Sequence, residues 1–374
     1  MRDQTNPYLE LAAPGIDGLK PYLPGKPISE LERELGISHS IKLASNENPL
    51  GVSDKVIEAI VGCSSELSRY PDGGAFQLRQ RLAEKHAVDP ACITLGNGSN
   101  DVLDMVARVF LSPAVESLFS QYAFAVYPIS SQAAGARLVI APAREYGHDL
   151  ERMLRMVTPK TRVIWIANPN NPTGTWLSRD ELLDFITQLP QHVILVLDEA
   201  YIEYVEESDY PDGSAWLQRF PNLIVTRTFS KAYGLASLRI GYGISNPDIA
   251  DLLNRVRQPF NVNSLAQSAA LAALQDQDFI QRSIALNNRG MQQYRQGFEK
   301  LGLDAIPSVA NFVTVDVAEE ATRIDQALLR EGCITRPIAN YGLPNHLRIS
   351  IGLEDENDRL LATLAKVLKP RFRS

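Results

Sequence analysis

Three short and nearly continuous apolar runs constrain the fold of this chain more than any other feature of its sequence. They occupy residues 163–167, 192–197 and 223–225, and such runs are typical of parallel strands that are buried on both faces. Between the first two runs, Ser178 and Glu181 form a capping-box pair at the start of an amphipathic helix. Strand, helix and strand together predict a right-handed βαβ unit, so we expect an α/β fold.

The chain is long enough for two lobes, because its 374 residues exceed what one hydrophobic core usually serves. Residues 1–45 are rich in proline and should form an N-terminal arm that also contributes to a small domain. We expect a large domain over residues 46–265 and a small α+β domain over residues 266–374. The boundary should lie along a long helical stretch from about residue 265 to residue 301.

Composition favours an enzyme that acts on small molecules. The net charge of -7 argues against nonspecific binding to nucleic acid, since such binding needs a basic surface. No apolar run approaches the ~18 residues of a membrane span, and no signal-peptide core follows Met1. The cysteines and histidines lack the spacing of a disulfide framework or a metal site. We therefore expect a cytoplasmic protein without a metal ion.

Polar loops follow the three apolar runs. Their notable side chains are Asn171 after the first run, Asp198 and Tyr201 after the second, and Lys231 after the third. A separate turn before a helix, Gly98-Ser99-Asn100, offers free backbone amides to an anion. Because the carboxyl ends of parallel strands share one edge of a sheet, these loops should converge on one ligand.

The chemistry of the loops matches a cofactor. A carboxylate at the end of a buried run, Asp198, needs a cationic partner such as a protonated pyridine nitrogen. Asn171 and Tyr201 can hydrogen-bond a phenolate oxygen, and Lys231 can bond to an aldehyde. Groups that suit a phosphate are supplied by Gly98, Ser99, Asn100, Thr228, Ser230 and Arg239. Together these demands describe pyridoxal 5'-phosphate, whereas each residue alone could be a helix cap, a turn residue or a surface charge.

Several motifs carry a resemblance to a known family. The most specific are Asn171-Pro172-Thr173-Gly174, Asp198 with Tyr201, and Ser230-Lys231. Further matching segments are residues 22–27, 44–49, 69–71, 341–344 and 347–352. Over nearly its full length the chain resembles the histidinol-phosphate aminotransferase family of fold-type I, class II aminotransferases. The resemblance implies a mostly parallel seven-stranded sheet between helices in the large domain, and a smaller α+β domain.

The resemblance also implies a role for each residue around the cofactor. Lys231 would form an aldimine with pyridoxal phosphate and later move a proton. Asp198 would keep the ring nitrogen protonated, and Asn171 and Tyr201 would tune the ring oxygen.

Two tyrosines have implied roles at the edge of the site. Tyr122 would stack on the ring, although Ser120-Gln121-Tyr122 replaces the proline-led loop that is usual in the family. Tyr70 would reach the phosphate of the neighbouring subunit, which implies a homodimer with shared sites.

The substrate side follows from the same resemblance. Arg348 would bind the carboxylate of glutamate and 2-oxoglutarate, Arg336 would bind the phosphate of histidinol phosphate, and Tyr22 and Asn46 would complete the site. Ordinary salt bridges are the alternative for both arginines. The implied reaction transfers an amino group between L-histidinol phosphate and 2-oxoglutarate in histidine biosynthesis. The alternatives are an aromatic amino-acid aminotransferase, a threonine-phosphate decarboxylase and a non-enzymatic binding protein with a degenerate site.

Overall fold

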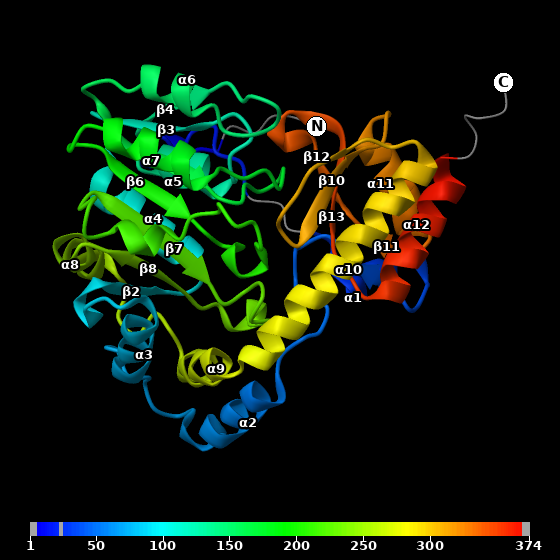
Figure 1. Cartoon of the computed structure of the whole chain (residues 1–374), viewed down its shortest axis with the longest axis horizontal. Helices are drawn as coiled ribbons and strands as arrows, with labels where there is room; N and C mark the ends of the chain where they lie inside the picture. The colour runs from blue at the N-terminus through cyan, green and yellow to red at the C-terminus, as the bar shows by residue number, and fades with distance from the viewer. Residues whose placement is uncertain (1–5, 22–24, 369–374) are drawn as a thin grey trace.

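Seven strands form one large sheet with helices on both faces, in a computed structural model that describes residues 6–21 and 25–368 (Figure 1). The order across the sheet is β2 (Ile93–Gly96), β8 (Gly241–Ser245), β7 (Leu223–Thr228), β6 (Ile194–Asp198), β5 (Thr161–Ala167), β3 (Glu116–Ser120) and β4 (Arg137–Ala141). β8 pairs antiparallel with β2 and with β7, and the other described pairs of this sheet are parallel. The predicted α/β fold with a mostly parallel seven-stranded sheet is confirmed, and the three apolar runs correspond to β5, β6 and β7.

Alternation along these strands divides the apolar side chains between two layers. In β6, Ile194 and Val196 belong to one layer, whereas Leu195 and Leu197 belong to the other. The first layer is covered by α4 (Ser99–Phe110), α5 (Val126–Ala133) and α8 (Pro247–Val256). The second is covered by α2 (Asp54–Cys63), α3 (Phe76–His86), α6 (Leu150–Arg155), α7 (Arg179–Gln188) and α9 (Ser264–Gln275). Because both faces are buried, the central strands read as continuous apolar runs.

A second lobe is built on a four-stranded antiparallel sheet. Its order is β12 (Arg336–Ile338), β13 (Leu343–Ser350), β10 (Phe312–Asp316) and β9 (Ala305–Ile306). The sheet packs against α10 (Gln277–Leu301), α11 (Ala321–Arg330) and α12 (Glu354–Leu368) around a third core. In Figure 1 the yellow helix α10 extends from the large lobe along the small one.

The N-terminal region joins the small lobe through a short parallel pairing. β1 (Ile41–Lys42) pairs with β11 (Cys333–Ile334), and the preceding α1 (Ile28–Leu35) packs nearby through Leu31. The predicted domain boundaries themselves stay a prediction. Short 3₁₀ turns complete the described elements: Leu9–Leu11, Ser64–Glu66, Pro90–Cys92, Ile202–Tyr204, Gly213–Trp216, Ala236–Leu238 and Ala339–Tyr341.

The predicted long helical stretch from about residue 265 to residue 301 consists of two helices. It divides into α9 and α10 at Asp276, whose backbone leaves the helical region with φ of -104° and ψ of 70°. Aspartate favours helix starts over helix interiors, because its short side chain competes for backbone hydrogen bonds. No helix within residues 6–21 and 25–368 is long and apolar enough to cross a membrane.

Candidate active site

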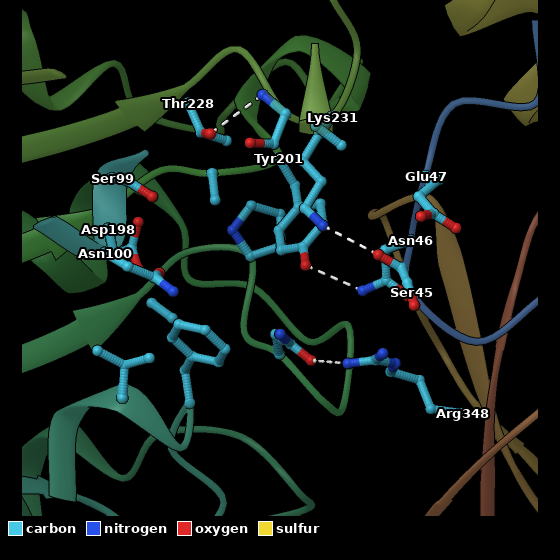
Figure 2. A pocket seen from close by; sticks show the side chains of 18 of the residues that line it. Ser45, Asn46, Glu47, Ser99, Asn100, Asp198, Tyr201, Thr228, Lys231 and Arg348 are labelled. Atoms are coloured by element: carbon cyan, nitrogen blue, oxygen red, sulfur yellow. Dashed lines mark hydrogen bonds between the residues drawn. The ribbon is translucent and has the colours of Figure 1, made fainter. Parts of the chain in front are cut away.

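A cavity of about 430 Å³ lies at the carboxyl ends of β5, β6 and β7, between the two lobes. In Figure 2, Ser99, Asn100 and Asp198 lie on one side of it, and Ser45, Asn46, Glu47 and Arg348 lie on the other. Twelve of the residues predicted for the site line this one cavity: Asn46, Ser99, Asn100, Asn171, Asp198, Tyr201, Thr228, Ser230, Lys231, Arg239, Arg336 and Arg348. The loops therefore converge as the parallel sheet requires.

Lys231 is held in the cavity by the turn that follows β7. The preceding Phe229 is fully buried and anchors the loop in the core. The chain then turns at Gly234, where φ is +74° and a side chain would meet the Gly51 carbonyl oxygen at 2.0 Å. The Lys231 Nζ donates a hydrogen bond of 3.1 Å to the Ser45 carbonyl oxygen.

The electrostatics around Lys231 favour a neutral amine. Burial lowers the pKa of Lys231 to about 7, and the positive charges of Arg348 and Arg239 act in the same direction, whereas Glu47 opposes them. A large fraction of the side chain therefore carries a free electron pair at neutral pH. Such an amine can attack a carbonyl carbon or accept a proton.

Asp198 is the last residue of β6 and is 4% exposed. Its Oδ2 accepts a hydrogen bond of 2.8 Å from the Tyr127 hydroxyl, and its Oδ1 accepts one of 2.9 Å from the Thr226 hydroxyl. Burial raises the pKa of the Asp198 carboxyl, while these hydrogen bonds and the charge of Lys231 lower it. A buried carboxylate with two neutral donors is suited to pair with a cation inside the cavity, such as a protonated ring nitrogen.

Two further hydrogen bonds connect the lobes across the cavity (Figure 2). The Tyr201 hydroxyl accepts a hydrogen bond of 2.9 Å from Asn46 Nδ2. Asn171 Oδ1 accepts one of 2.7 Å from Arg348 Nη1, and Arg348 Nη2 donates to the Ala44 carbonyl oxygen at 2.7 Å. Burial raises the pKa of Tyr201 to about 12, against the charge of Arg348, so the phenol stays protonated at neutral pH.

One corner of the cavity is built for an anion. The α4 helix begins there at Ser99, with free backbone amides in its first turn. Arg239 lies beside this turn, since a side chain at Gly98 would meet its Nη2 at 2.3 Å. Gly98 has φ of +83°, so glycine is required both by conformation and by the approach of the guanidinium. Hydroxyls of Thr228 and Ser230 complete a donor set that fits a phosphate.

In the turn before α5, the aromatic residue that lines the cavity is not the predicted Tyr122. Phe124 lines the cavity, whereas Tyr122 does not. The Tyr122 ring lies 6.0 Å from the ring of Tyr146, and its carbonyl oxygen accepts a hydrogen bond of 3.0 Å from Asn170 Nδ2. The turn before α5 sets which aromatic side chain points inward, and composition alone could not resolve that register.

Two other predicted residues, Gly98 and Tyr70, do not line the cavity, and two unpredicted residues contact Asp198. Gly98 contributes through its backbone and its contact with Arg239. Tyr70 is 82% exposed and stacks on Phe260 with a centroid distance of 4.7 Å. Tyr22 lies outside the described residues. Sequence reasoning missed Tyr127 and Thr226 as partners of Asp198; the pairing of Thr226 with Asp198 depends on strand register.

Comparisons with known proteins agree on one family. The family model of the class I and II aminotransferases matches residues 38–364 of this chain. Histidinol-phosphate aminotransferase 2 of Pseudomonas aeruginosa is 59% identical over 363 residues, which cover 96% of this chain and 98% of that protein. Histidinol-phosphate aminotransferase 1 of Nitrosococcus oceani is 56% identical over 362 residues, which cover 97% of this chain and 98% of that protein.

Solved structures have the same architecture. Histidinol-phosphate aminotransferase from Sinorhizobium meliloti, in complex with pyridoxal-5'-phosphate, superimposes with a TM-score of 0.87 at 30% identity, covering 96% of this chain and 97% of that one. The L-threonine-O-3-phosphate decarboxylase of Porphyromonas gingivalis superimposes with a TM-score of 0.80 at 25% identity, covering 88% of this chain and 99% of that one.

The lowered pKa of Lys231 predicts its reactivity toward acylating reagents. Because the pKa is about 7, the reaction rate of Lys231 should level off above about pH 8, while an ordinary solvated lysine keeps gaining reactivity to about pH 10. Pulse acetylation of ligand-free protein at a series of pH values, read by peptide mass spectrometry, measures this profile. A Lys231 rate that still rises between pH 9 and pH 10 would contradict it.

Proposed function

The chain belongs to the class I and II aminotransferases, and from this premise we propose that it transfers an amino group between L-histidinol phosphate and 2-oxoglutarate, with pyridoxal phosphate as cofactor. The relatives cited above support the substrate, and the donor set of the cavity supports the cofactor. One observation carries the assignment: a neutral-leaning lysine, a buried carboxylate and two guanidiniums from the small lobe share a single cavity.

The cavity residues divide the cofactor's functional groups among them. Asp198 would hold the proton on the ring nitrogen, and Asn171 and Tyr201 would hydrogen-bond the ring oxygen. Phe124 would pack against the ring face. The phosphate would be bound by the first turn of α4 together with Arg239 and the nearby hydroxyls. When bound, the group supplies an aldehyde that bonds to amines and a ring that accepts electron density.

Lys231 would supply the proton transfers. With a pKa near neutrality, its amine can take a proton from the substrate Cα and return it to a neighbouring carbon without a large energetic penalty in either direction. The hydrogen bond to the Ser45 carbonyl oxygen keeps Nζ in the cavity before substrate arrives. Transamination needs both steps, so one residue of intermediate pKa can serve the whole cycle.

Two arginines of the small lobe support anionic substrates. Arg336 and Arg348 are direct cross-strand partners in β12 and β13, and both line the cavity. Like charges opposite each other in a sheet repel, and a bound anion relieves that repulsion. Arg348 is 7% exposed and forms no salt bridge with any carboxylate among the described residues. We assign the substrate carboxylate to Arg348 and the phosphate to Arg336, with Asn46 beside them.

Substrate competition tests the proposal. With 2-oxoglutarate as acceptor, we expect kcat/KM for L-histidinol phosphate to exceed that for phenylalanine or tyrosine by at least about tenfold, because a phosphate carries more charge and more acceptor oxygens for the guanidiniums than a carboxylate does. Glutamate formation in a coupled assay measures each rate. Equal or greater efficiency with an aromatic amino acid would replace the first assignment.

The lyase alternative has a separate readout. The fold is shared with a threonine-phosphate decarboxylase, so threonine phosphate should be tested in the same assay without an amino acceptor. Release of carbon dioxide would favour decarboxylation. Glutamate formation from histidinol phosphate without such release would favour transamination.

The two arginines should affect different half-reactions. Arg336→Gln should lower kcat/KM for histidinol phosphate by about 10- to 100-fold, the cost of losing a hydrogen-bonded charge partner. Arg348→Gln should act mainly on the half-reaction with 2-oxoglutarate. Single-turnover kinetics measure the efficiency of each half-reaction in each variant. The ratio of the efficiency with histidinol phosphate to that with 2-oxoglutarate should fall in Arg336→Gln and rise in Arg348→Gln. Equal losses in both half-reactions for both variants would remove the assignment.

We infer that the protein is a homodimer. Apolar side chains are exposed on α2, on α3 and on the loops beside them: Ile57, Val61, Leu67, Tyr70, Phe76 and Phe260. A surface of this kind is typical of an interface with another copy. Tyr70 belongs to this surface and does not line the cavity of its own chain, which is consistent with a contribution to the neighbouring site.

Subunit mixing tests the shared site. Tyr70→Phe should impair activity and Lys231→Ala should abolish it, but random mixing of the two should recover about a quarter of the wild-type activity, because half of the dimers then contain one intact site. Size-exclusion chromatography with light scattering gives the oligomeric state. A mixture no more active than the average of its parents would exclude a Tyr70 contribution across the interface.

We also infer a location in the reducing cytoplasm. Cys63, Cys92 and Cys333 are all free thiols. Unpaired cysteines support such a compartment, since oxidising environments favour disulfides.

A further inference from the structure

Tyr127 has no role in the assignments above, yet its hydroxyl contacts the carboxylate on which the cofactor assignment depends. The hydroxyl donates to Asp198 Oδ2 at 2.8 Å, and the side chain is fully buried. Tyr127 lies on α5, which covers one face of the large sheet, whereas Asp198 ends β6. The contact therefore joins a covering helix to the catalytic edge of the sheet.

The position of Asp198 in β6 explains why such a contact is needed. Side chains alternate along a strand, so Asp198 follows Ile194 and Val196 on the same face. On the neighbouring strands, Ala167 and Thr226 are its direct partners. The carboxylate thus extends an apolar layer, in which a bare charge costs much free energy. Among the described residues, Tyr127 and Thr226 are the side chains that hydrogen-bond to it.

Packing holds the Tyr127 ring in one place. It stacks on Trp165 with centroids 5.3 Å apart and an interplanar angle of 10°, and Phe124 contacts it edge-on at 5.7 Å. The Trp165 indole N–H donates to Ser117 Oγ at 2.8 Å, and Ser117 Oγ lies 2.7 Å from Ser131 Oγ. The ring, and with it the hydroxyl, is therefore held by Trp165 and Phe124.

We propose that Tyr127 is a positioning residue that keeps Asp198 ionised and aimed into the cavity. Each carboxylate oxygen accepts one hydrogen bond, from Tyr127 or from Thr226, and keeps a further lone pair for a ring nitrogen. A protonated Asp198 would instead carry a hydrogen that competes with one of these donors. The two hydroxyls thus select the charged form. The catalytic meaning of this role rests on the proposed cofactor, whereas the ionisation of Asp198 does not.

Other charged and titratable groups near this contact also affect the pKa of Asp198 or Tyr127. Lys231 faces Asp198 from the loop after β7, and its charge lowers the pKa of the carboxyl. Tyr201 faces both Asp198 and Tyr127, and Tyr341 faces Tyr127 and Tyr201 from the small lobe. Burial raises the pKa of Asp198, and hydrogen bonds from Tyr127 and Thr226 lower it. Removal of the Tyr127 hydroxyl should therefore raise that pKa further.

The test is Tyr127→Phe, which removes the hydroxyl and keeps the ring. Carbon-13 NMR of aspartate-labelled full-length protein, assigned by Asp198→Asn, gives the titration of Asp198 with and without pyridoxal phosphate. In ligand-free protein we expect the midpoint to rise by about one to two pH units, the effect of one hydrogen bond to a charged group. The dissociation constant of pyridoxal phosphate should rise by about tenfold.

Two comparisons separate positioning from a general packing effect. Ser130→Ala removes another buried hydroxyl from the same helix, one outside the contacts that hold the Tyr127 ring, and should leave the Asp198 midpoint unchanged. Site-specific fluorotyrosine at position 127 strengthens the donor and should shift the midpoint downward, which also provides a result if Tyr127→Phe folds poorly. An unchanged midpoint in both position-127 variants, or an equal shift in Ser130→Ala, would overturn the proposal. A shift as expected supports it even if the substrate profile favours another aminotransferase reaction.

Discussion

A charge at the end of an apolar strand is the constraint on which the rest of the site depends. β6 contributes four apolar side chains to the two core layers and then ends in Asp198, which is 4% exposed. The free energy needed to keep a carboxylate there is large, and it is offset by two hydroxyl donors and by whatever cation enters the cavity. The same sheet that buries the carboxylate also brings Lys231 and the α4 N-terminus to its edge. Fold stability and cofactor chemistry are therefore coupled at one residue.

The order of chemistry along the chain could be predicted from the sequence, because it depends on local patterns. Apolar runs predicted β5, β6 and β7, and the polar loops after them predicted one shared cavity. Sequence spacing does not specify which side chains meet across strands or helices. The register that pairs Thr226 with Asp198, and Arg336 with Arg348, is a tertiary property. So is the turn that points Phe124 inward in place of Tyr122, and the break at Asp276 that separates α9 from α10.

Paired arginines show how the small lobe can be stable and still respond to substrate. Arg336 and Arg348 lie opposite each other on adjacent strands, an arrangement that costs stability unless the charges are compensated. Arg348 is partly satisfied by Asn171 Oδ1 and the Ala44 carbonyl oxygen, both of which are neutral. Its partners lie outside its own sheet, so the guanidinium links the two lobes. On the proposed assignments, an anion that binds between the arginines would add negative charge there and strengthen this link.

The charge of Arg348 also connects substrate binding to proton transfer. That charge is among the causes that lower the pKa of Lys231 to about 7. When a substrate carboxylate pairs with Arg348, the positive potential at Lys231 falls, and the affinity of its amine for a proton rises. On the proposed assignments, Lys231 would thus be a stronger base with an anionic substrate in the site, at the stage when a proton must leave the substrate Cα. The carboxylate of Asp198 lies on the opposite side of the cavity, where it accepts hydrogen bonds from the hydroxyls of Tyr127 and Thr226. On the proposed assignments, the end of the site at Arg348 would respond to the substrate while the end at Asp198 stays constant, because Arg348 lies on the small lobe and Asp198 on the large sheet.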